Sequence, residues 1–405
     1  MKFTKVKFVF FAVAFIFLIF FSSDFGLIDI EKTAIITAIA IDVNNNEYEL
    51  TAQISVPEAT DSNSENSKAH ITGTGKTMGA AFKDLGEVSG WFPNLNFCNL
   101  IILSNDLATT NSMKVLDYFA RTLRMQDSAL VVLFEGKAKE IIKYSTPLDN
   151  ISAFAIQKIL FKNAGFDIEV AKMDIKTFAV GYYSKGHSSY MPIIKTIEAN
   201  ENPQEGSQQS SSSDMLSSGK TSSNSSKSSS QSKKYFSANY TALFNYGIKV
   251  GQLDPLLTTT FNILTTSFEG STFEVNNVSD GITSKNYLLT VLRNSPSLSL
   301  DVSVNKIVFN VNLDLYCKVS DQNSEGGENG LIKNIPIPNN VIEKAQQQLT
   351  TQINNLIEVS KKTGCDFFEI ADKLYRRHNK FYALYKDNYL DKLQANVKVK
   401  VQGQR

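Results

Sequence analysis

The run "HITGTGKTMG", which begins at His70, contains Gly75-Lys76-Thr77, the residue types that hold nucleotide phosphates. A phosphate-binding loop needs a glycine, four further residues and then Gly-Lys-Ser or Gly-Lys-Thr, so that backbone N–H groups surround the phosphate. The first glycine would fall at His70, and Gly73 has the wrong spacing. The residues before the loop are polar, not an apolar parallel strand. We therefore expect a strand, a glycine turn and a helix capped by Thr77 instead of a nucleotide site.

Other residues that commonly carry chemistry are scattered along the chain. The histidines are His70, His187 and His378, and the cysteines are Cys98, Cys317 and Cys365. No histidine has metal-ligand spacing to a cysteine or a paired carboxylate, and three widely separated cysteines predict no disulfide framework. The chain also lacks the Gly-x-Ser-x-Gly and His-Glu-x-x-His motifs. The sequence predicts no catalytic residue, no cofactor, no metal site and no enzyme activity.

Two groups of cationic side chains are candidate interaction residues. They are Arg121 and Arg124 in the first, and Arg376, Arg377, His378 and Lys380 in the second. The first pair lies three residues apart on an expected helix, where it could hold an anion or form a surface salt bridge. The second group ends an expected helix, where cations complement the helix dipole. A partner-binding or membrane-facing basic patch is the alternative for that group.

Composition narrows the class of protein. Hydrophobic residues make up 42% of the 405 residues, charged residues make up 20%, and the net charge is +1. This is an ordinary globular balance with enough length for two or three domains. A net charge near zero argues against nucleic acid as a partner.

The N-terminus is different from the rest of the chain. Lys2, Lys5 and Lys7 precede an apolar run over residues 8–21. The lysines should stay in the cytoplasm, which directs the remaining chain to the extracytoplasmic side. The run is short against the roughly 20 residues of a full span, and "FFSSDFG" is a poor cleavage site. We favour an uncleaved membrane anchor over residues 1–23, and a cleaved signal peptide is the alternative.

Residues 24–200 read as an α+β region. "TAIITAIAIDV", "EYELTAQISV", "CNLIILS" and "ALVVLFEG" are expected strands, because they are apolar or alternate strictly. Three helices are expected. The first has the apolar face Met78, Phe82, Leu85 and Val88, and the second has the apolar face Leu116, Phe119 and Leu123. The stretch "KAKEIIKYS" is a short third helix. Residues 201–234 are rich in serine and almost free of apolar side chains, so we expect a flexible linker.

Residues 235–405 are expected to form a C-terminal α+β domain. In two stretches apolar and polar residues alternate with a period of two, as in strands. The apolar positions expected to face inward are Leu298, Leu300, Val302 and Val304 in the first stretch. In the second they are Ile307, Phe309, Val311, Leu313, Leu315, Cys317 and Val319. A long helix should follow, capped by Asn340 and ended by Gly364. A second helix, "DFFEIADKLYRRH", should bury Phe367, Ile370 and Leu374, and "NVKVKVQ" closes the chain as a strand. The predicted fold class is α+β, with mostly antiparallel or mixed sheets covered by helices.

Five of these stretches, in this order, resemble the Ger(x)C family, the C subunit of spore germinant receptors. The stretches are "AIITAIAID" with "YELTAQISVP"; "GTGKTMGAAFKDL"; "NLIILSNDLA" with "LDYFARTLRMQDSALVVLFEGKAKEII"; "YTALFNYGIKVGQLD"; and the block from "DFFEIADKLYRRH" to "ANVKVKV". The resemblance covers nearly the whole chain. It implies a multidomain ectodomain on the outer face of the spore inner membrane. It also implies a non-enzymatic role in nutrient-triggered germination beside two integral-membrane subunits.

The chain departs from the family at three places. Asp24 stands where the family has its lipidated cysteine, so lipidation is not expected and the N-terminal helix itself should be the anchor. "DPLLTTT" replaces a Glu-Thr pair that usually follows Val-Gly-x-Leu, and Glu369 replaces a common glycine. An extracytoplasmic domain that binds a small molecule is the alternative function.

Overall fold

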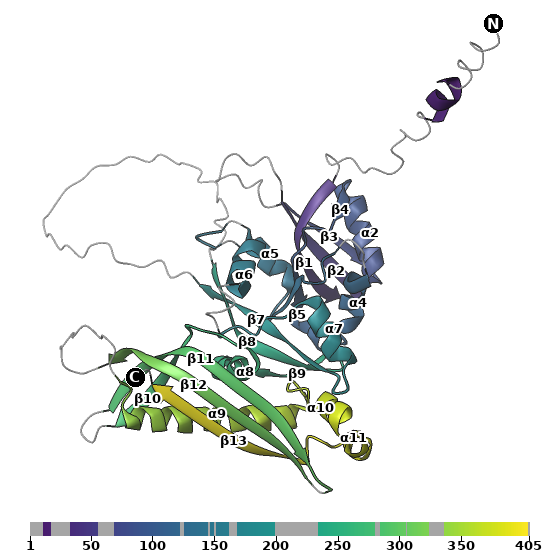
Figure 1. The fold of residues 1–405 in the computed structure, drawn as a ribbon. Coiled ribbons are helices and arrows are strands. Elements are labelled where there is room, and N and C mark those ends of the chain that lie inside the picture. Colours follow the sequence, from purple (N-terminus) through teal and green to yellow (C-terminus); the bar gives the residue numbers. More distant parts are fainter. Residues whose placement is uncertain are drawn as a thin grey trace, which may run out of the picture.

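The computed structural model describes residues 11–17, 33–55, 69–121, 125–144, 146–149, 151–161, 168–198, 234–279, 284–304, 306–323 and 336–403. These residues form two β-sheets with packed helices, which confirms the α+β class (Figure 1). Residues 11–17 of the expected anchor are helical. Within the described ranges no helix combines the length and apolarity needed to cross a bilayer. Asp24 and residues 199–233, which include most of the expected linker, lie outside the described residues.

The first sheet has the strand order β3-β2-β1-β5-β6-β7-β8-β9, and β4 continues alongside the start of β1. Its strands are β1 (Thr33–Asn44), β2 (Glu47–Ser55), β3 (Ala69–Gly75), β4 (Phe92–Asn94), β5 (Leu100–Ser104), β6 (Leu130–Phe134), β7 (Ser188–Glu198), β8 (Lys234–Asn245) and β9 (Ile248–Leu253). The central strands β1, β5, β6 and β7 are parallel, and the outer pairings are antiparallel. The sheet is therefore mixed.

Helices cover both faces of the first sheet. On β1, Ile39 and Ile41 face one hydrophobic core, while Ala38 and Ala40 face another. The first core includes α2 (Met78–Ser89), α3 (Asn105–Ala108), α4 (Met113–Arg121) and α7 (Ile175–Tyr183), and the second includes α5 (Ala138–Lys143) and α6 (Ser152–Phe161). Burial on both faces explains why these strands are continuously apolar in the sequence.

The second sheet has the order β10-β11-β12-β13. Its strands are β10 (Thr272–Ser279), β11 (Ser284–Val302), β12 (Ile307–Asn323) and β13 (Leu393–Gly403), and β13 joins β12 in parallel. One face packs on the helices α8 (Pro255–Thr265), α9 (Asn339–Thr363), α10 (Ile370–Arg377) and α11 (Asn379–Tyr385). The alternation predicted for β12 is confirmed, because its odd-numbered residues from Ile307 to Val319 are buried.

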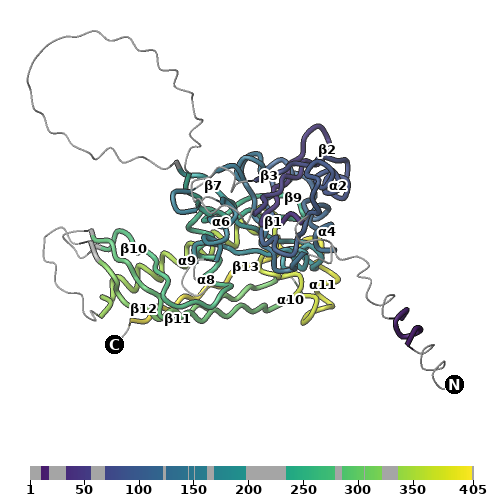
Figure 2. Tube along the Cα trace, turned by 90° about the horizontal axis from the view of Figure 1, so that it is seen from above, coloured from purple at the N-terminus to yellow at the C-terminus, as the bar shows by residue number. Residues whose placement is uncertain are grey.

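The first sheet contains strands from both sides of the expected linker. Strands β8 and β9 follow it in the sequence, yet β8 pairs with β7 in the first sheet. Lys234, placed in the linker by the sequence, is the first residue of β8. In Figure 2, α8 and α9 lie between the strands of the two sheets. The division into domains at residues 200 and 235 stays a prediction, since the first sheet uses residues from both sides of it.

Two helix starts differ from the prediction. Helix α9 begins at Asn339, and the carbonyl of Pro338 accepts from the N–H groups of Val341 and Ile342. Asn340 is therefore not the cap, because the proline's fixed φ already sets the first turn. Gly364 does end the helix, with a left-handed φ of 65°. The next helix, α10, starts only at Ile370, after a left-handed residue.

Two residues assigned to apolar faces are exposed. Val304 follows the last residue of β11 and is 72% exposed, while Leu298, Leu300 and Val302 pack on the core as expected. Val88 is 65% exposed, although Met78 and Leu85 of the same helix are buried. Val88 lies in the last turn of α2, and the helical period alone does not show which side chains of a face are covered.

The glycines of the phosphate-loop-like run allow α2 to pack closely on β3. A Cβ atom on Gly73 would lie 2.4 Å from the carbonyl oxygen of Ala81, and one on Gly75 would lie 2.5 Å from the backbone nitrogen of Ala81. The side chain of Thr77 accepts from Ala80 N at 3.1 Å, which confirms the predicted cap. Strand β3 is an antiparallel edge strand, unlike the parallel strand before a phosphate-binding loop.

We predict that Gly73→Ala lowers the free energy of unfolding by about 3 kcal/mol, because the added methyl group clashes with backbone atoms of α2. Gly79→Ala is the matched control. Its Cβ would lie 3.5 Å from Tyr118, an ordinary contact, and alanine should stabilise the helix by about 0.5–1 kcal/mol. Urea unfolding followed by circular dichroism measures both changes. Equal effects of the two substitutions would contradict the close packing.

Candidate functional site

A buried carboxylate, Asp366, lies where the turn before β7 meets the turn between α9 and α10. Asp366 is 2% exposed. Its oxygens accept from Ile370 N and Ala371 N, each at 2.8 Å, and from the hydroxyl of Tyr389 at 3.1 Å. These bonds satisfy the first two backbone N–H groups of α10, which have no partner inside the helix. Asp366 therefore fixes where α10 starts and in which direction it runs.

The first sheet approaches Asp366 from the other side. The backbone N–H of Asp366 donates to Ser188 Oγ at 2.8 Å, and a Cβ on Gly186 would lie 2.9 Å from Asp366 Oδ2. Nearby, Lys185 N donates to Asp372 Oδ2 at 3.1 Å, and Asn245 donates to the carbonyl of Gly364 at 2.9 Å. The turn between α9 and α10, together with the first part of α10, is thus bonded directly to residues 185–188 and to the end of β8.

Burial determines the protonation of this junction. It raises the pKa of Asp366 above the ordinary value, although the two backbone N–H groups and Tyr389 oppose the shift by bonding to the charged form. The adjacent Cys365 thiol donates to the carbonyl of Phe244, and burial raises its pKa to about 12. A thiol with that pKa stays protonated at neutral pH and is a poor nucleophile. These groups therefore act in packing and hydrogen bonding.

Aromatic side chains hold the same turn against the second sheet. The rings of Phe367 and Phe261 lie edge-to-face at 5.5 Å between centroids, and the rings of Phe368 and Phe309 lie 5.2 Å apart. The sequence placed Phe367 inside a helix, but it lies in the turn before α10. Glu369, which replaces the glycine expected from the family, has a left-handed φ of 57°. That conformation explains why glycine suits the position.

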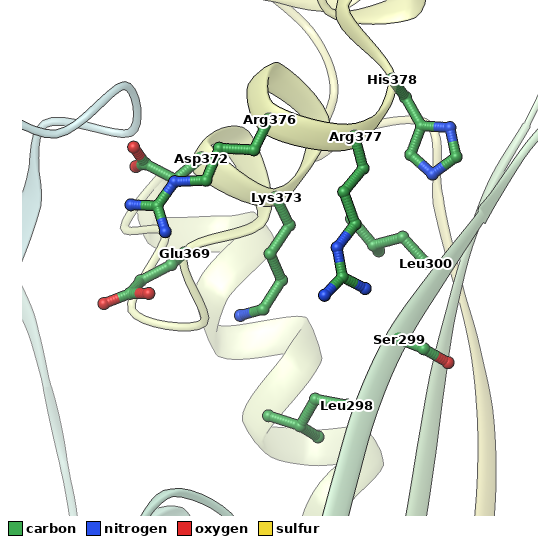
Figure 3. A pocket seen from close by; sticks show the side chains of 9 residues that line it. All are labelled: Leu298, Ser299, Leu300, Glu369, Asp372, Lys373, Arg376, Arg377 and His378. Atoms are coloured by element: carbon green, nitrogen blue, oxygen red, sulfur yellow. The ribbon is translucent and has the colours of Figure 1, made fainter.

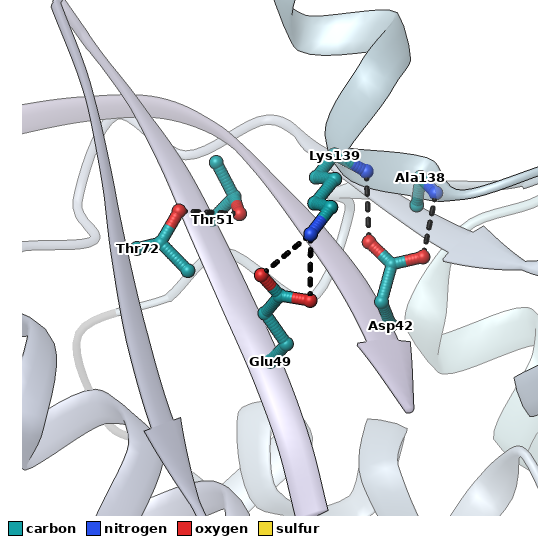
Figure 4. Close-up of polar contacts among 6 residues, drawn as sticks. All are labelled: Asp42, Glu49, Thr51, Thr72, Ala138 and Lys139. Carbon is teal, nitrogen blue, oxygen red and sulfur yellow. Dashed lines mark hydrogen bonds and ion pairs between the residues drawn. The ribbon is translucent and has the colours of Figure 1, made fainter. Parts of the chain in front are cut away.

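A second buried aspartate has the same structural role in the first sheet (Figure 4). Asp42 accepts from Ala138 N at 2.7 Å and from Lys139 N at 2.8 Å, which are the first residues of α5. Lys139 Nζ in turn donates to Glu49 at 2.8 Å. Burial raises the pKa of Asp42. Both oxygens of this carboxylate are used to orient a helix, as in Asp366.

The exposed side of α10 forms one wall of a small cleft of about 200 Å³ (Figure 3). Strand β11 provides Leu298, Ser299 and Leu300, and the segment around α10 provides Glu369, Asp372, Lys373, Arg376, Arg377 and His378. Figure 3 shows the side chains of Lys373 and Arg377 extending from α10 on the side where Leu298 projects from β11. Burial lowers the pKa of Lys373, whose ammonium donates to the carbonyl of Phe368. The cleft thus combines a partly apolar floor with a charged wall, on which Lys373, Arg376 and Arg377 lie beside the carboxylates of Glu369 and Asp372.

The predicted interaction residues are partly brought together. Arg376, Arg377 and His378 line the cleft, and Lys380 is exposed on α11 outside it. Arg121 lies on α4 and forms an ion pair with Asp117 at 2.6 Å, which is the simpler of the two roles considered for it. Arg124 lies outside the described residues.

Sequence reasoning missed the rest of the cleft. Lys373 could have been found, because it lies three and four residues before the two arginines on one helix. Leu298 and Leu300 could not have been found from the sequence. They belong to a strand about 75 residues earlier, which lies beside α10 only in the folded chain.

Comparisons with known proteins find similarity along most of the chain. The family model described as "Spore germination protein N-terminal domain" matches residues 27–196, and "Spore germination B3/GerAC like, C-terminal" matches residues 239–404. A crystal structure of the GerBC protein superposes with a TM-score of 0.52 at 14% sequence identity, covering 91% of this chain and 97% of that one. At that identity the likeness concerns the fold. No curated protein matched.

Replacing the buried carboxylate should destabilise the protein. We predict that Asp366→Asn lowers the free energy of unfolding by about 3 kcal/mol, because one amide oxygen cannot accept both backbone N–H groups and Tyr389. Asp372→Asn, which alters a more exposed bond to Lys185 N, is the matched control and should cost less than about 1 kcal/mol. Denaturant unfolding of the full chain gives both values. A cost for Asp366→Asn no greater than for the control would contradict the role of this carboxylate.

The raised pKa of Asp366 also predicts a pH dependence. The folded state holds this proton more tightly than the unfolded state, so the stability contributed by Asp366 is greatest at low pH. It decreases as the pH rises from the ordinary value of 3.8 through the raised folded-state value, and then becomes constant. The stability advantage of the wild type over Asp366→Asn should therefore shrink with rising pH. Unfolding free energies of both proteins across that range test the sign, and a growing advantage would contradict it.

Proposed function

Because the chain belongs to the Ger(x)C family of spore germination proteins, we propose that it is a non-catalytic subunit of a membrane-associated germinant receptor. In this proposal it contributes to nutrient-triggered spore germination through contacts with two integral-membrane subunits. The wall of the cleft at α10 is the contact surface. The observation that supports this contact surface is the position of Arg376 and Arg377 on α10, a helix whose start is fixed by hydrogen bonds to Asp366.

The two arginines of α10 are available to a partner. Both side chains are exposed, and neither forms an ion pair with any residue in the described part of the chain. Arg121, in contrast, already has Asp117 as its partner. A guanidinium presents several N–H donors in a planar fork that suits a carboxylate. These two guanidinium groups are therefore suited to acidic side chains of a partner.

Leucine side chains beside the arginines give the surface a second type of contact. Leu298 and Leu300 are partly exposed at the floor of the cleft. A partner segment with a carboxylate next to an apolar side chain would bond to the two arginines and cover the leucines. Interfaces in which charged groups surround an apolar contact combine steering with burial of surface. We infer that the partner presents such an acidic and apolar segment.

The buried reactive groups support a non-catalytic role. The carboxylates of Asp366 and Asp42 are occupied by backbone N–H groups of helices. The thiols of Cys98, Cys317 and Cys365 are buried, and burial raises the pKa of each to about 12. Each of these groups has a structural explanation.

The N-terminal sequence supports placement on the extracytoplasmic face of a membrane. Three lysines precede the apolar run over residues 8–21, as in a segment that keeps its N-terminus in the cytoplasm. Asp24 replaces the cysteine that would carry a lipid, so we propose that the apolar run itself is the anchor. The spore inner membrane is the location that the family implies.

We predict that Arg376→Glu combined with Arg377→Glu reduces recovery of the partner subunits at least about ten-fold, equivalent to roughly 1.4 kcal/mol. The reversed charges would repel the acidic side chains that the arginines attract. The measurement is co-purification of the partners with the tagged full chain from membranes, by quantitative mass spectrometry.

Arg121→Glu is the matched control, because it reverses the same type of charge at a site whose arginine already has a partner. It should leave recovery of the partners unchanged. If the double substitution behaved like Arg121→Glu, the cleft at α10 would not be the docking surface. Circular dichroism of each variant establishes that it is folded.

A further inference from the structure

The end of α2, strand β4 and the turns on either side of β4 expose four apolar side chains, here called the apolar patch. The patch consists of Val88, Trp91, Phe92 and Phe97, which are 65%, 48%, 55% and 58% exposed. A left-handed turn at Gly90, with φ 68°, separates Val88 from the aromatic residues. Isolated exposed apolar side chains are common, but four within ten residues, three of them aromatic, mark an interaction surface.

The patch is free of charge. From Val88 to Leu103 the sequence contains no aspartate, glutamate, lysine or arginine. The nearest charged group before it, Glu87, forms an ion pair with Lys83 at 3.2 Å. A surface of this kind can enter an apolar environment without removing a charge from water, which would be costly. Tryptophan is moreover enriched at the boundary between lipid headgroups and acyl chains.

The patch also lies where the chain leads back to the N-terminal apolar run. Strand β4 pairs in parallel with the first residues of β1, and Thr33 is opposite Phe92. Eleven residues, 22–32, separate Thr33 from the run over residues 8–21. Eleven residues can span at most about 40 Å, so a membrane-inserted run keeps this end of the first sheet close to the bilayer.

We propose that the apolar patch of Val88, Trp91, Phe92 and Phe97 inserts into the outer surface of the lipid bilayer. This proposal rests on the membrane attachment in the proposed function and adds a second contact to it. The patch orients the first sheet so that β4 and the start of β1 face the membrane. Insertion is shallow, to about 5–10 Å, as for other apolar surfaces that lie at the membrane interface.

Trp91 makes the proposal directly testable, because it is the single tryptophan of the chain. The full chain is reconstituted in phosphatidylcholine nanodiscs that carry a nitroxide quencher near the headgroup or near the end of the acyl chain. We expect Trp91 fluorescence to shift to shorter wavelength and to be quenched more by the shallow label than by the deep one. Phe92→Ser combined with Phe97→Ser should weaken the quenching without unfolding the protein, since both side chains are exposed.

The matched control moves the tryptophan to another exposed apolar position. Trp91→Phe combined with Leu384→Trp places it on α11, well apart from β4 in Figure 1, at a site that is 70% exposed. This tryptophan should not be quenched by either label.

Three results would overturn the proposal, and they are distinguishable. If the chain stays with the nanodiscs but Trp91 is quenched no more than the tryptophan at position 384, the patch does not meet lipid, although the attachment stands. A Trp91 signal that instead depends on protein concentration would assign the patch to a second copy. If the chain does not stay with the nanodiscs, both the attachment and the patch proposal fail.

Discussion

The bonds made by one buried carboxylate determine how the parts of this protein are arranged. Asp366 binds the first N–H groups of α10, the hydroxyl of Tyr389 and, through its own N–H, the hydroxyl of Ser188. An acidic group is costly to bury unless donors surround it, so the junction is stable only when all of these donors are in place. The carboxylate therefore couples α10 to the segment before β13, and the backbone N–H of the same residue connects both to the first sheet.

The consequence for function is that the cleft at α10 is preorganised. Arg376 and Arg377 lie within two turns of the residues that Asp366 holds, and Asp372 adds a bond to Lys185. A partner that binds a fixed helix does not have to order it first, which reduces the entropic cost of binding. The apolar patch lies on β4 and the end of α2, well apart from α10 in Figure 1. If both proposals hold, one end of the molecule contacts lipid while the other contacts protein.

Local patterns predicted much of the fold, because they depend on neighbours in the sequence. The alternation from Ile307 to Val319 and the left-handed Gly364 appear as expected. The helix capped by Thr77 was predicted from the sequence, but the close packing of α2 on Gly73 and Gly75 could not be predicted from it. Contacts between distant segments also could not be predicted from the sequence. Examples are the pairing of β8 with β7 in the first sheet and the position of Leu298 beside α10. Val88 was misplaced because a helical period indicates a face but does not show which of its positions are covered in the fold.

Hydrogen exchange at the backbone amides of Ile370 and Ala371 tests the central claim most directly. In the folded full chain these two N–H groups should exchange as slowly as the amides of β12, because releasing them breaks their bonds to Asp366 and opens the buried junction. Exchange as fast as that of exposed amides in α11 would show that the carboxylate does not hold the helix. The account of a fixed docking surface would then be wrong.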